Sequence, residues 1–368
     1  MYRVLMFGMT ENPGGVESFL INYYRHIDRT KIQFDFLCNS YEPVAYEDEL
    51  KELGGRTFHI CARSVNYKTY KAEIEDLFQK HSKEWDAIWV NICSLANIDY
   101  LKLAKKYGIE RRIIHSHNSQ NMDSRLRGML HKFNKLSIDK YATDYWACSD
   151  DAAKWFYKDK MMDKVIVIHN AIDVDRIAFN EQKRQTIRDQ YGLKDKFIIG
   201  NVGRLHFQKN QSFMLDIFKE YSKKDQDALL VIVGQGPDEK MLKDKTKTLG
   251  LEDKVIFTGL QKDIQAWLSS FDVFLFPSVF EGLSIAALEA QANGVPILAS
   301  EGVIPQEVKM CDNFTFYSLD HTATEWADKL EEMKKVQRMS YQKTKQTFIQ
   351  KGYDIDTEVK KLEELFSE

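Results

Sequence analysis

Phe274-Leu-Phe-Pro-Ser-Val-Phe-Glu-Gly-Leu-Ser-Ile-Ala-Ala-Leu-Glu289 is the most informative stretch of this sequence, and it continues through Asn293-Gly-Val-Pro296 into Ile297-Leu-Ala-Ser300. Its first residues form a short apolar, aromatic run that a proline ends, as a buried strand does. The alanine- and leucine-rich residues after Ser284 have the composition and length of a helix, which Gly294 ends. The stretch therefore predicts a strand, a loop, a helix and a second strand.

The loop and the helix start predict a site for a phosphate joined to a sugar. Ser284 is placed to cap the helix, and Gly282 lets the backbone approach an anion at the unpaired N–H groups of the helix start. Helical rise places Glu289 roughly 7 Å along the axis from Ser284. Carboxylates such as Glu281 and Glu289 accept hydrogen bonds from paired sugar hydroxyls, so we expect a nucleotide sugar, with Glu289 toward the ribose and Glu281 toward the transferred sugar. The alternative is two acids on a solvated helix with an ordinary cap.

The same residues resemble a known family. Glu281 and Glu289, together with Phe280-Glu-Gly-Leu-Ser284 and Gly294-Val-Pro296, are similar to the E-x7-E signature of the retaining glycosyltransferases of family 4, which have the GT-B fold. In that family the first glutamate contacts the donor sugar and the second holds the ribose. The resemblance, which is greatest to bacterial exopolysaccharide and capsule enzymes, implies that Gly282, Leu283 and Ser284 also bind the donor.

Composition indicates two domains of ordinary size and no affinity for nucleic acid. At 368 residues the chain exceeds what one core normally supports, and 52 Lys and Arg against 55 Asp and Glu leave a net charge of −3. Five scattered cysteines without a C-x-x-C pair argue against a disulfide framework and a zinc site, and they favour a reducing cytoplasm. We expect no secretory signal, because the first residues already fit a strand, and no apolar run approaches the ~20 residues that span a bilayer.

The N-terminus contains a second candidate phosphate loop. Residues 3–7 predict a strand, residues 8–15 a glycine-rich loop and residues 16–26 a helix. This order suits the approach to a phosphate, but the G-x-G-x-x-G pattern of dinucleotide-binding proteins is missing. The resemblance implies that Gly14 and Gly15, with the following Val16 and Glu17, form the loop that faces the donor phosphates and the acceptor. A plain tight turn would explain the same residues.

Strands and helices alternate along the chain, which predicts parallel sheets covered on both faces. The pattern breaks at His169-Asn-Ala-Ile-Asp173, which resembles the hinge between the domains of the family. We therefore expect the α/β class and the GT-B fold, with two Rossmann-like, doubly wound domains that face a cleft. The expected domains are 1–170 on the acceptor side and 171–352 for the nucleotide sugar. Two helices are expected to follow an edge strand at 314–317, and the resemblance implies that the last, within 353–368, packs back on the first domain.

His117 follows the strand from Arg112 to His115, at the strand end where open α/β sheets bind their ligands. The resemblance implies that His117 touches the donor sugar. A histidine hydrogen-bonded only to its neighbours is an equal alternative. A metal site is not expected, because no carboxylate or cysteine cluster accompanies the two histidines.

Two cations begin the second domain. Arg204 follows the strand 197–202 and offers a planar fork, and Lys209 offers a point charge, so both suit a diphosphate. They match the G-R-L…K-N pattern of the family, in which these two cations hold the leaving diphosphate. The alternative is a solvated pair without a role. Gly259 and Leu260 lie at the end of the strand 255–257, where the backbone of the family meets the nucleobase.

A basic amphipathic helix is predicted at residues 125–136. Its apolar residues recur at helical spacing, and arginines and lysines occupy the other positions. This composition is typical of a helix on a membrane surface when the apolar side is exposed. The apolar side could equally pack on the sheet beneath it, and we favour packing because most amphipathic helices of globular domains pack in this way.

These observations predict an enzyme that transfers a hexose-type sugar from a nucleotide diphosphate sugar to a glycan or lipid-linked acceptor in cell-surface polysaccharide synthesis. We favour a UDP-sugar as the donor. The expected catalytic residues are His117, Arg204, Lys209 and Glu281. We expect retention of the anomeric configuration and neither cofactor nor metal, since the D-x-D pairs at 173–175 and 354–356 fall in the hinge and before the last helix. The alternatives are a nucleotide-sugar epimerase or a phosphorylase of the same fold, and a non-catalytic nucleotide-sugar binding protein.

Overall fold

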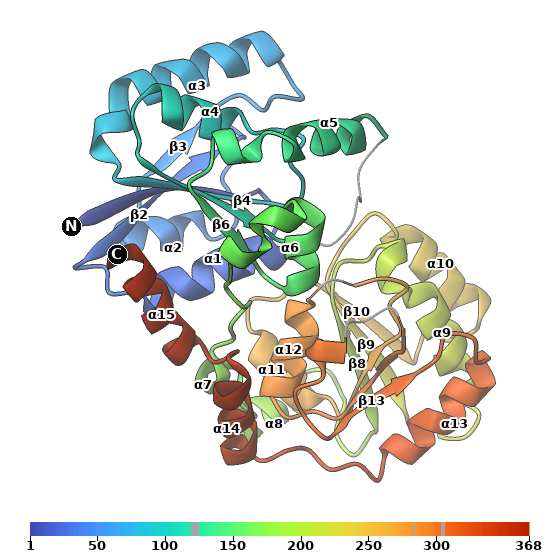
Figure 1. Ribbon diagram of the computed structural model, residues 1–368. Coiled ribbons are helices and arrows are strands. Elements are labelled where there is room, and N and C mark those ends of the chain that lie inside the picture. Colours follow the sequence, from blue (N-terminus) through green and yellow to red (C-terminus); the bar gives the residue numbers. More distant parts are fainter. Residues whose placement is uncertain (119–124, 282, 303–305, 368) are drawn as a thin grey trace. The chain divides into compact units, whose positions relative to one another are not determined.

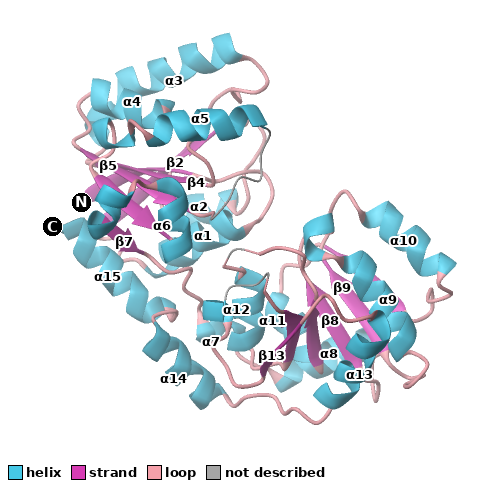
Figure 2. Cartoon of the chain, turned by 45° about the vertical axis from the view of Figure 1, so that its right-hand side comes forward, coloured by secondary structure: helices cyan, strands magenta, loops and turns pink. Residues whose placement is uncertain are grey.

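The computed structural model describes residues 1–118, 125–281, 283–302 and 306–367. The chain divides into two compact units: Met1–Ala171 joins Ile355–Glu368 in the first unit, and Ile172–Asp354 forms the second (Figure 1). Each unit is a parallel sheet with helices on its two faces (Figure 2), so the predicted α/β class with two Rossmann-like sheets is confirmed. Among the described residues, no helix is long and apolar enough to cross a bilayer.

The sheet of the first unit is doubly wound. Over the described residues its strand order is β3-β2-β1-β4-β5-β6-β7, so the direction of winding reverses between β1 and β4, where folds of this kind bind ligands. Its strands are β1 (Tyr2–Phe7), β2 (Ile32–Cys38), β3 (Thr57–His59), β4 (Ala87–Ile92), β5 (Arg111–Ser116), β6 (Asp144–Ala147) and β7 (Val165–Val167). Its α-helices are α1 (Gly15–His26), α2 (Glu47–Glu52), α3 (Tyr67–His81), α4 (Asp99–Lys106), α5 (Arg125–Lys135), α6 (Asp150–Phe156) and α15 (Ile355–Ser367).

Both faces of this sheet are buried because its central strands carry consecutive apolar residues, at 4–6 of β1 and 87–90 of β4. Helices α3, α4 and α6 cover one face, and α1 and α15 cover the other. Phe366 of α15 brings its ring centroid to 5.7 Å from those of Trp89 and Trp146. The C-terminal helix therefore completes the core of the first unit.

Helix α5 does not pack as we expected. Its buried side chains are His131 and Asn134, whereas the large apolar side chains of the helix are exposed. The expectation that the apolar side packs on the sheet is therefore wrong. The reason is that the helix contacts the first unit through hydrogen bonds of its polar side chains, and Asn134 donates to the backbone oxygen of Leu95 at 2.6 Å.

The sheet of the second unit is also doubly wound and parallel. Its strand order over the described residues is β10-β9-β8-β11-β12-β13, and the reversal lies between β8 and β11. Its strands are β8 (Ile198–Val202), β9 (Leu229–Val233), β10 (Val255–Gly259), β11 (Val273–Phe276), β12 (Ile297–Ser300) and β13 (Phe314–Tyr317). Its α-helices are α7 (Val174–Ile177), α8 (Glu181–Gln190), α9 (Gln211–Tyr221), α10 (Glu239–Thr248), α11 (Ile264–Ser270), α12 (Ile285–Ala292), α13 (Ala323–Met333) and α14 (Tyr341–Lys351).

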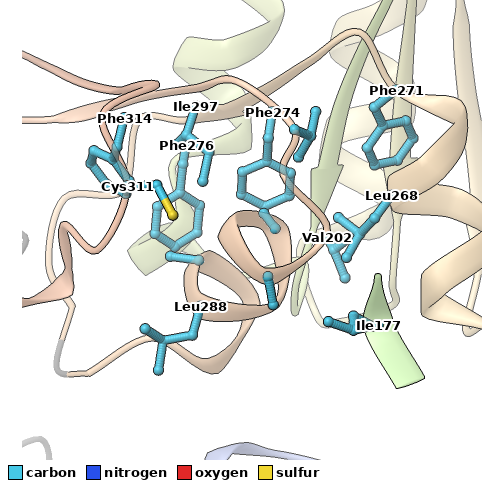
Figure 3. Packing of buried hydrophobic residues seen from close by; sticks show 14 of the residues in the cluster. Ile177, Val202, Leu268, Phe271, Phe274, Phe276, Leu288, Ile297, Cys311 and Phe314 are labelled. Carbon is cyan, nitrogen blue, oxygen red and sulfur yellow. The ribbon is translucent and has the colours of Figure 1, made fainter. Parts of the chain in front are cut away.

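Strand β11 and helix α12 lie at the centre of this unit's core. Phe274 and Phe276 point to the same face of the sheet, since side chains alternate along a strand, and they pack among Leu288 of α12, Ile297 of β12 and Phe314 of β13 (Figure 3). This strand and helix flank Glu281, so their burial anchors both ends of the segment that carries this residue.

The structure has one more helix near the C-terminus than we expected. Within the described residues, α13, α14 and α15 follow β13, where two helices were predicted. Gly352, with φ of 74°, ends α14 in the left-handed conformation that favours glycine, and α15 starts shortly after it.

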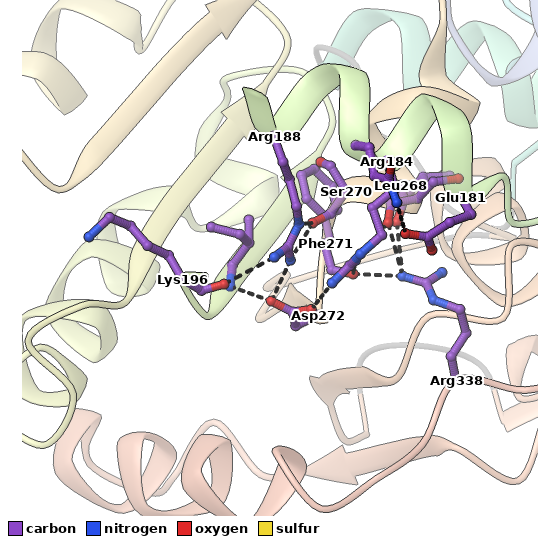
Figure 4. Close-up of polar contacts among 12 residues, drawn as sticks. Glu181, Arg184, Arg188, Lys196, Leu268, Ser270, Phe271, Asp272 and Arg338 are labelled. Carbon is purple, nitrogen blue, oxygen red and sulfur yellow. Dashed lines mark hydrogen bonds and ion pairs between the residues drawn. The ribbon is translucent and has the colours of Figure 1, made fainter. Parts of the chain in front are cut away.

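Charged side chains stabilise the amino end of β11, opposite the end that leads into the loop with Glu281. Asp272, just before the strand, accepts from Arg184 and Arg188 of α8 at 2.6 Å each (Figure 4). Arg338 donates to the backbone oxygen of Phe271 at 2.6 Å, and burial lowers the pKa of Arg338 to about 9. These contacts join α8, β11 and the segment before α14 at the amino end of the strand, so they stabilise the unit at the end remote from the loop 277–284.

Candidate functional site

The loops after β8 and β11 are joined to each other. The backbone N–H of Val279 donates to the backbone oxygen of Gln208 at 2.9 Å, and the amide of Gln208 donates to the backbone oxygen of Phe280 at 3.0 Å. Asn210 donates from its side chain to the backbone oxygen of Pro277 at 3.0 Å. Because β8 and β11 are neighbours, their carboxyl ends place these two loops side by side at the reversal point of the sheet.

Lys209 and Glu281 meet at this junction. The ammonium of Lys209 lies 2.6 Å from Oε1 of Glu281, and both side chains are largely buried. The hydroxyl of Ser278, which is fully buried, donates to the same carboxylate oxygen at 2.8 Å. Ser300 of β12 donates to the backbone oxygen of Ser278 at 2.6 Å. The carboxylate is thus held by Lys209 and Ser278, and Ser300 fixes the backbone of Ser278. An ammonium with three donors can hold the carboxylate while donating to a further anion.

Arg204 lies on the loop directly after β8. Its backbone oxygen accepts from the side chain of Gln211 at 3.0 Å, and its own side chain is exposed. Over the part of the chain that the structure describes, no carboxylate pairs with its guanidinium. The loop is held close to the end of β9, because a Cβ at Gly234 would lie 2.0 Å from the backbone oxygen of Gly203. Arg204 therefore offers an unengaged fork on a fixed backbone, a short distance along the chain from Lys209.

Ser284 caps α12 as predicted. Its hydroxyl accepts from the backbone N–H of Ala287 at 3.4 Å, and the residue is buried. Leu283 packs against the core of the unit. Glu289 is half-buried in the second turn of the helix. The predicted donor-binding residue Gly282 lies outside the described residues.

Gly259 and Leu260 lie farther along the same edge of the sheet. Gly259 ends β10, which is separated from β8 by β9, and its backbone oxygen accepts from the N–H of Gly234 at 2.9 Å. Leu260 is exposed beyond it. The structure therefore brings Arg204, Lys209 and Glu281 onto adjoining loops and places Gly259 and Leu260 at the end of a strand two positions away.

His117 lies at the corresponding edge of the first unit. Its Nε2 lies 2.9 Å from Oδ1 of Asn91 at the end of β4. The side-chain N–H of Asn91 donates to the backbone oxygen of Trp89 at 3.3 Å, which turns Oδ1 toward the histidine. Nε2 of His117 therefore carries the proton, and Nδ1 is an acceptor. Burial lowers the pKa of His117 to about 3, so the ring is neutral at physiological pH.

The glycine loop of the first unit holds a carboxylate. Gly14 is the N-cap of α1, and a Cβ at this position would lie 2.8 Å from Oε2 of Glu17. Thr10 donates to Oε1 of Glu17 at 2.6 Å. Burial raises the pKa of Glu17, and hydrogen bonds from Thr10 and from backbone N–H groups, that of Gly14 among them, oppose the rise. Gly15 begins α1, and a Cβ at this position would meet nothing within 4 Å. Glu17 thus binds at the helix start where sequence reasoning expected a phosphate of the ligand.

The sequence pattern assigned no role to Asn91 or Ser278, and the resemblance placed Glu17 only in the loop that faces the donor phosphates and the acceptor. Glu17 sits three residues after the N-cap, which is the position from which a glutamate reaches back to the helix start. Asn91 is a polar residue at the carboxyl end of a buried strand, and this place alone is a signal for a site residue. Ser278 offered no signal, because a serine after a proline is an ordinary loop residue.

The chain is similar to known glycosyltransferases. A family model described as "Glycosyl transferases group 1" matches residues 183–354. Over 367 residues, which are 97% of this chain and 94% of the relative, the chain is 29% identical to "Putative glycosyltransferase EpsF" of Bacillus subtilis. It is 34% identical to the UDP-Gal:alpha-D-GlcNAc-diphosphoundecaprenol alpha-1,3-galactosyltransferase of Escherichia coli over 40% of this chain and 38% of that protein.

A solved structure shows the same fold over the full length. Alr3699/HepE of Anabaena, in complex with UDP and glucose, superposes with a TM-score of 0.80, 17% identity and complete coverage of both chains. Together with the family match over the second unit and the similarity along nearly the whole chain, this likeness confirms the predicted fold.

Proposed function

Because this chain belongs to the group 1 glycosyltransferases, the family 4 enzymes of GT-B fold, we propose that it transfers a hexose-type sugar from a UDP-sugar to a glycan or lipid-linked acceptor of cell-surface polysaccharide synthesis. The observation that carries the proposal is the contact of Lys209 with Glu281 on the joined loops after β8 and β11. A cation for a diphosphate and a carboxylate for sugar hydroxyls are the two groups that a nucleotide sugar requires at one place.

The proposed donor contacts follow from the chemistry of each group. Arg204 and Lys209 bind the diphosphate, and Glu281 accepts from hydroxyls of the transferred sugar. Glu289 accepts from the ribose, and backbone groups at Gly282, Leu283 and Ser284 approach the phosphates. Gly259 and Leu260 contact the base. His117 contacts the transferred sugar as a neutral ring, and Gly14 and Gly15 belong to the loop that faces the donor phosphates.

The proposed reaction requires no protein nucleophile. Departure of the diphosphate builds negative charge, and Arg204 and Lys209 stabilise this charge most strongly when the bond to the sugar is broken. The family is retaining and metal-independent. We infer that the acceptor hydroxyl attacks from the face that the diphosphate leaves, and that the departing diphosphate takes the hydroxyl proton.

UDP is favoured as the nucleotide by two similar proteins. The galactosyltransferase of Escherichia coli is named for UDP-Gal, and Alr3699/HepE was solved with UDP and glucose. The lipid-linked acceptor rests on the former name, which includes diphosphoundecaprenol. A cytoplasmic location is supported by the scattered cysteines, none of which forms a disulfide in the described residues. The use of a nucleotide sugar as donor supports the same location.

The test separates transfer from binding and from epimerisation. The protein is first screened by thermal shift against UDP, GDP, ADP and their common sugars, and the stabilising donor is then incubated with lipid-linked glycan acceptors. We expect release of UDP that depends on the acceptor, with the sugar recovered on the acceptor. Stabilisation without release would leave a binding protein, and an epimerised donor without transfer would indicate an epimerase.

A further inference from the structure

A phenylalanine is exposed beside the proposed diphosphate contacts. Phe207 begins the short 3₁₀ turn η4 (Phe207–Lys209), and it lies between Arg204 and Lys209 in the sequence. It is 67% exposed, although phenylalanine is among the residues that are most often buried. Leu205, on the same loop, is fully buried. The loop after β8 therefore buries one large apolar side chain and presents another to solvent.

Hydrogen bonds fix the backbone of this turn. The backbone N–H of Lys209 donates to the backbone oxygen of His206 at 2.8 Å, and that of Asn210 donates to the backbone oxygen of Phe207 at 3.1 Å. Asn210, with φ of 55°, leads directly into α9. The ring of His206 lies beside that of Phe207, with centroids 4.4 Å apart. The ring of Phe207 is therefore presented from a fixed backbone.

Val279, on the loop after β11, adds apolar surface next to this turn. It is 44% exposed, and its backbone N–H donates to the backbone oxygen of Gln208, the residue after Phe207, at 2.9 Å. Glu281 follows two residues after Val279, and its carboxylate pairs with Lys209. Exposed apolar residues on two joined loops thus adjoin the buried pair of charges.

This combination of groups suits a sugar ring. The hydroxyls of a sugar form a polar rim, which a carboxylate such as that of Glu281 can bind. The C–H groups form apolar faces, which the negative face of an aromatic ring attracts. Phe207 and Glu281 therefore offer partners for both kinds of sugar surface on adjoining loops.

The side from which the acceptor approaches follows from the proposed function, on which this inference rests. In the proposed reaction the acceptor hydroxyl attacks from the face that the diphosphate leaves. The acceptor therefore lies on the side of the loop after β8, because Arg204 and Lys209 of this loop bind the diphosphate. Phe207 is the exposed aromatic residue of the same loop.

We propose that Phe207 binds the acceptor, by stacking its ring on the C–H face of the sugar that carries the attacking hydroxyl. Val279 contacts the edge of the same sugar. The acceptor group is then a sugar, free or linked to a lipid, and not a lipid phosphate or another alcohol. The nucleobase is a poorer partner for the ring, because Gly259 and Leu260, its proposed contacts, lie at the end of β10, which β9 separates from β8.

The experiment measures transfer from the preferred UDP-sugar to the octyl glycosides of glucose, galactose and N-acetylglucosamine. For the best of these acceptors, Phe207→Ala should raise KM about tenfold, because the aromatic contact is lost, with kcat within about twofold of its original value. Val279→Ser should raise KM about threefold, because less apolar area is covered. Phe207→Trp keeps an aromatic face and should keep KM within about twofold. The affinity of Phe207→Ala for UDP in calorimetry should equal that of the unchanged chain.

Met241→Ala is the matched control, since Met241 is an exposed apolar residue on α10, and it should leave KM and kcat unchanged. An acceptor KM that Phe207→Ala leaves at its original value would overturn the inference. Weaker UDP binding by this variant would overturn it too, because the ring would then contact the nucleotide. Transfer to a non-sugar alcohol or a lipid phosphate, with none to the glycosides, would overturn the inference and leave the proposed function standing. Absence of transfer to every acceptor would contradict the proposed function itself, and the inference with it.

Discussion

Replacing Lys209 by methionine should separate the stabilising role of this lysine from its role in transfer. The change keeps most of the side-chain volume and leaves the carboxylate of Glu281, which is 6% exposed, with Ser278 as its remaining side-chain partner. Breaking a buried ion pair by removing one partner costs about 3–5 kcal/mol. In a unit of this size each kcal/mol lowers the melting temperature by about 2–4 °C, so Lys209→Met should lower it by about 6–20 °C.

The double variant Lys209→Met/Glu281→Gln removes the unpaired charge. Its melting temperature should recover most of the loss, whereas transfer should stay at least about a hundredfold below that of the unchanged chain, because the cation for the leaving diphosphate is absent. Scanning calorimetry and an assay of UDP release measure the two quantities. Lys245→Met is the matched control, since Lys245 and Asp216 form a 2.6 Å pair that is more exposed, and it should cost less than about 1 kcal/mol. Equal losses of stability for Lys209→Met and Lys245→Met would contradict a stabilising role for the buried pair. Transfer that recovers together with stability would contradict a role for Lys209 in catalysis.

Three further outcomes are expected. Glu289→Ala should weaken donor binding about tenfold to a hundredfold in calorimetry, since it removes a charged acceptor for ribose hydroxyls, and unchanged affinity would place the ribose elsewhere. Burial depresses the pKa of His117 to about 3, and that of His115 well below its usual value, so the unfolded chain binds protons first as pH falls. The free energy of unfolding should therefore fall below pH ~6.5 by up to about 1.4 kcal/mol per pH unit and per histidine, and His117→Asn should reduce this slope in urea titrations. Gly234→Ala should abolish soluble expression, because its Cβ would lie 2.0 Å from a backbone oxygen, whereas Gly250→Ala, also at positive φ but in open space, should cost only about 1 kcal/mol.

Elements with a clear apolar pattern were predicted close to their observed bounds. The apolar run from 272 to 276 became β11 (Val273–Phe276), and Ser284 caps α12 as its position indicated. Helix α8 was not predicted, because none of its residues is buried and its sequence carries no apolar periodicity. Its arginines instead reach Asp272, a contact between residues far apart in the sequence that no local pattern announces.

The site was predictable as a set of residue types and not as a set of contacts. The charges of Arg204, Lys209 and Glu281 suggested a diphosphate and a sugar from the sequence. The ion pair of Lys209 with Glu281 depends on the pairing of β8 with β11. The same carboxylate oxygen also accepts a hydrogen bond from Ser278. The exposed side of α5 was mistaken for its buried side because periodicity gives the width of an apolar stripe but not the direction in which it points.

The proposed mechanism is best tested by the stereochemistry of transfer in the absence of divalent metal. The purified chain is incubated with its preferred nucleotide sugar and acceptor in excess EDTA, and the new linkage is examined by NMR. We predict undiminished transfer and a product with the anomeric configuration of the donor, since Arg204 and Lys209 stabilise the leaving diphosphate. Activity that EDTA removes and Mg²⁺ or Mn²⁺ restores, or an inverted anomeric centre, would contradict it.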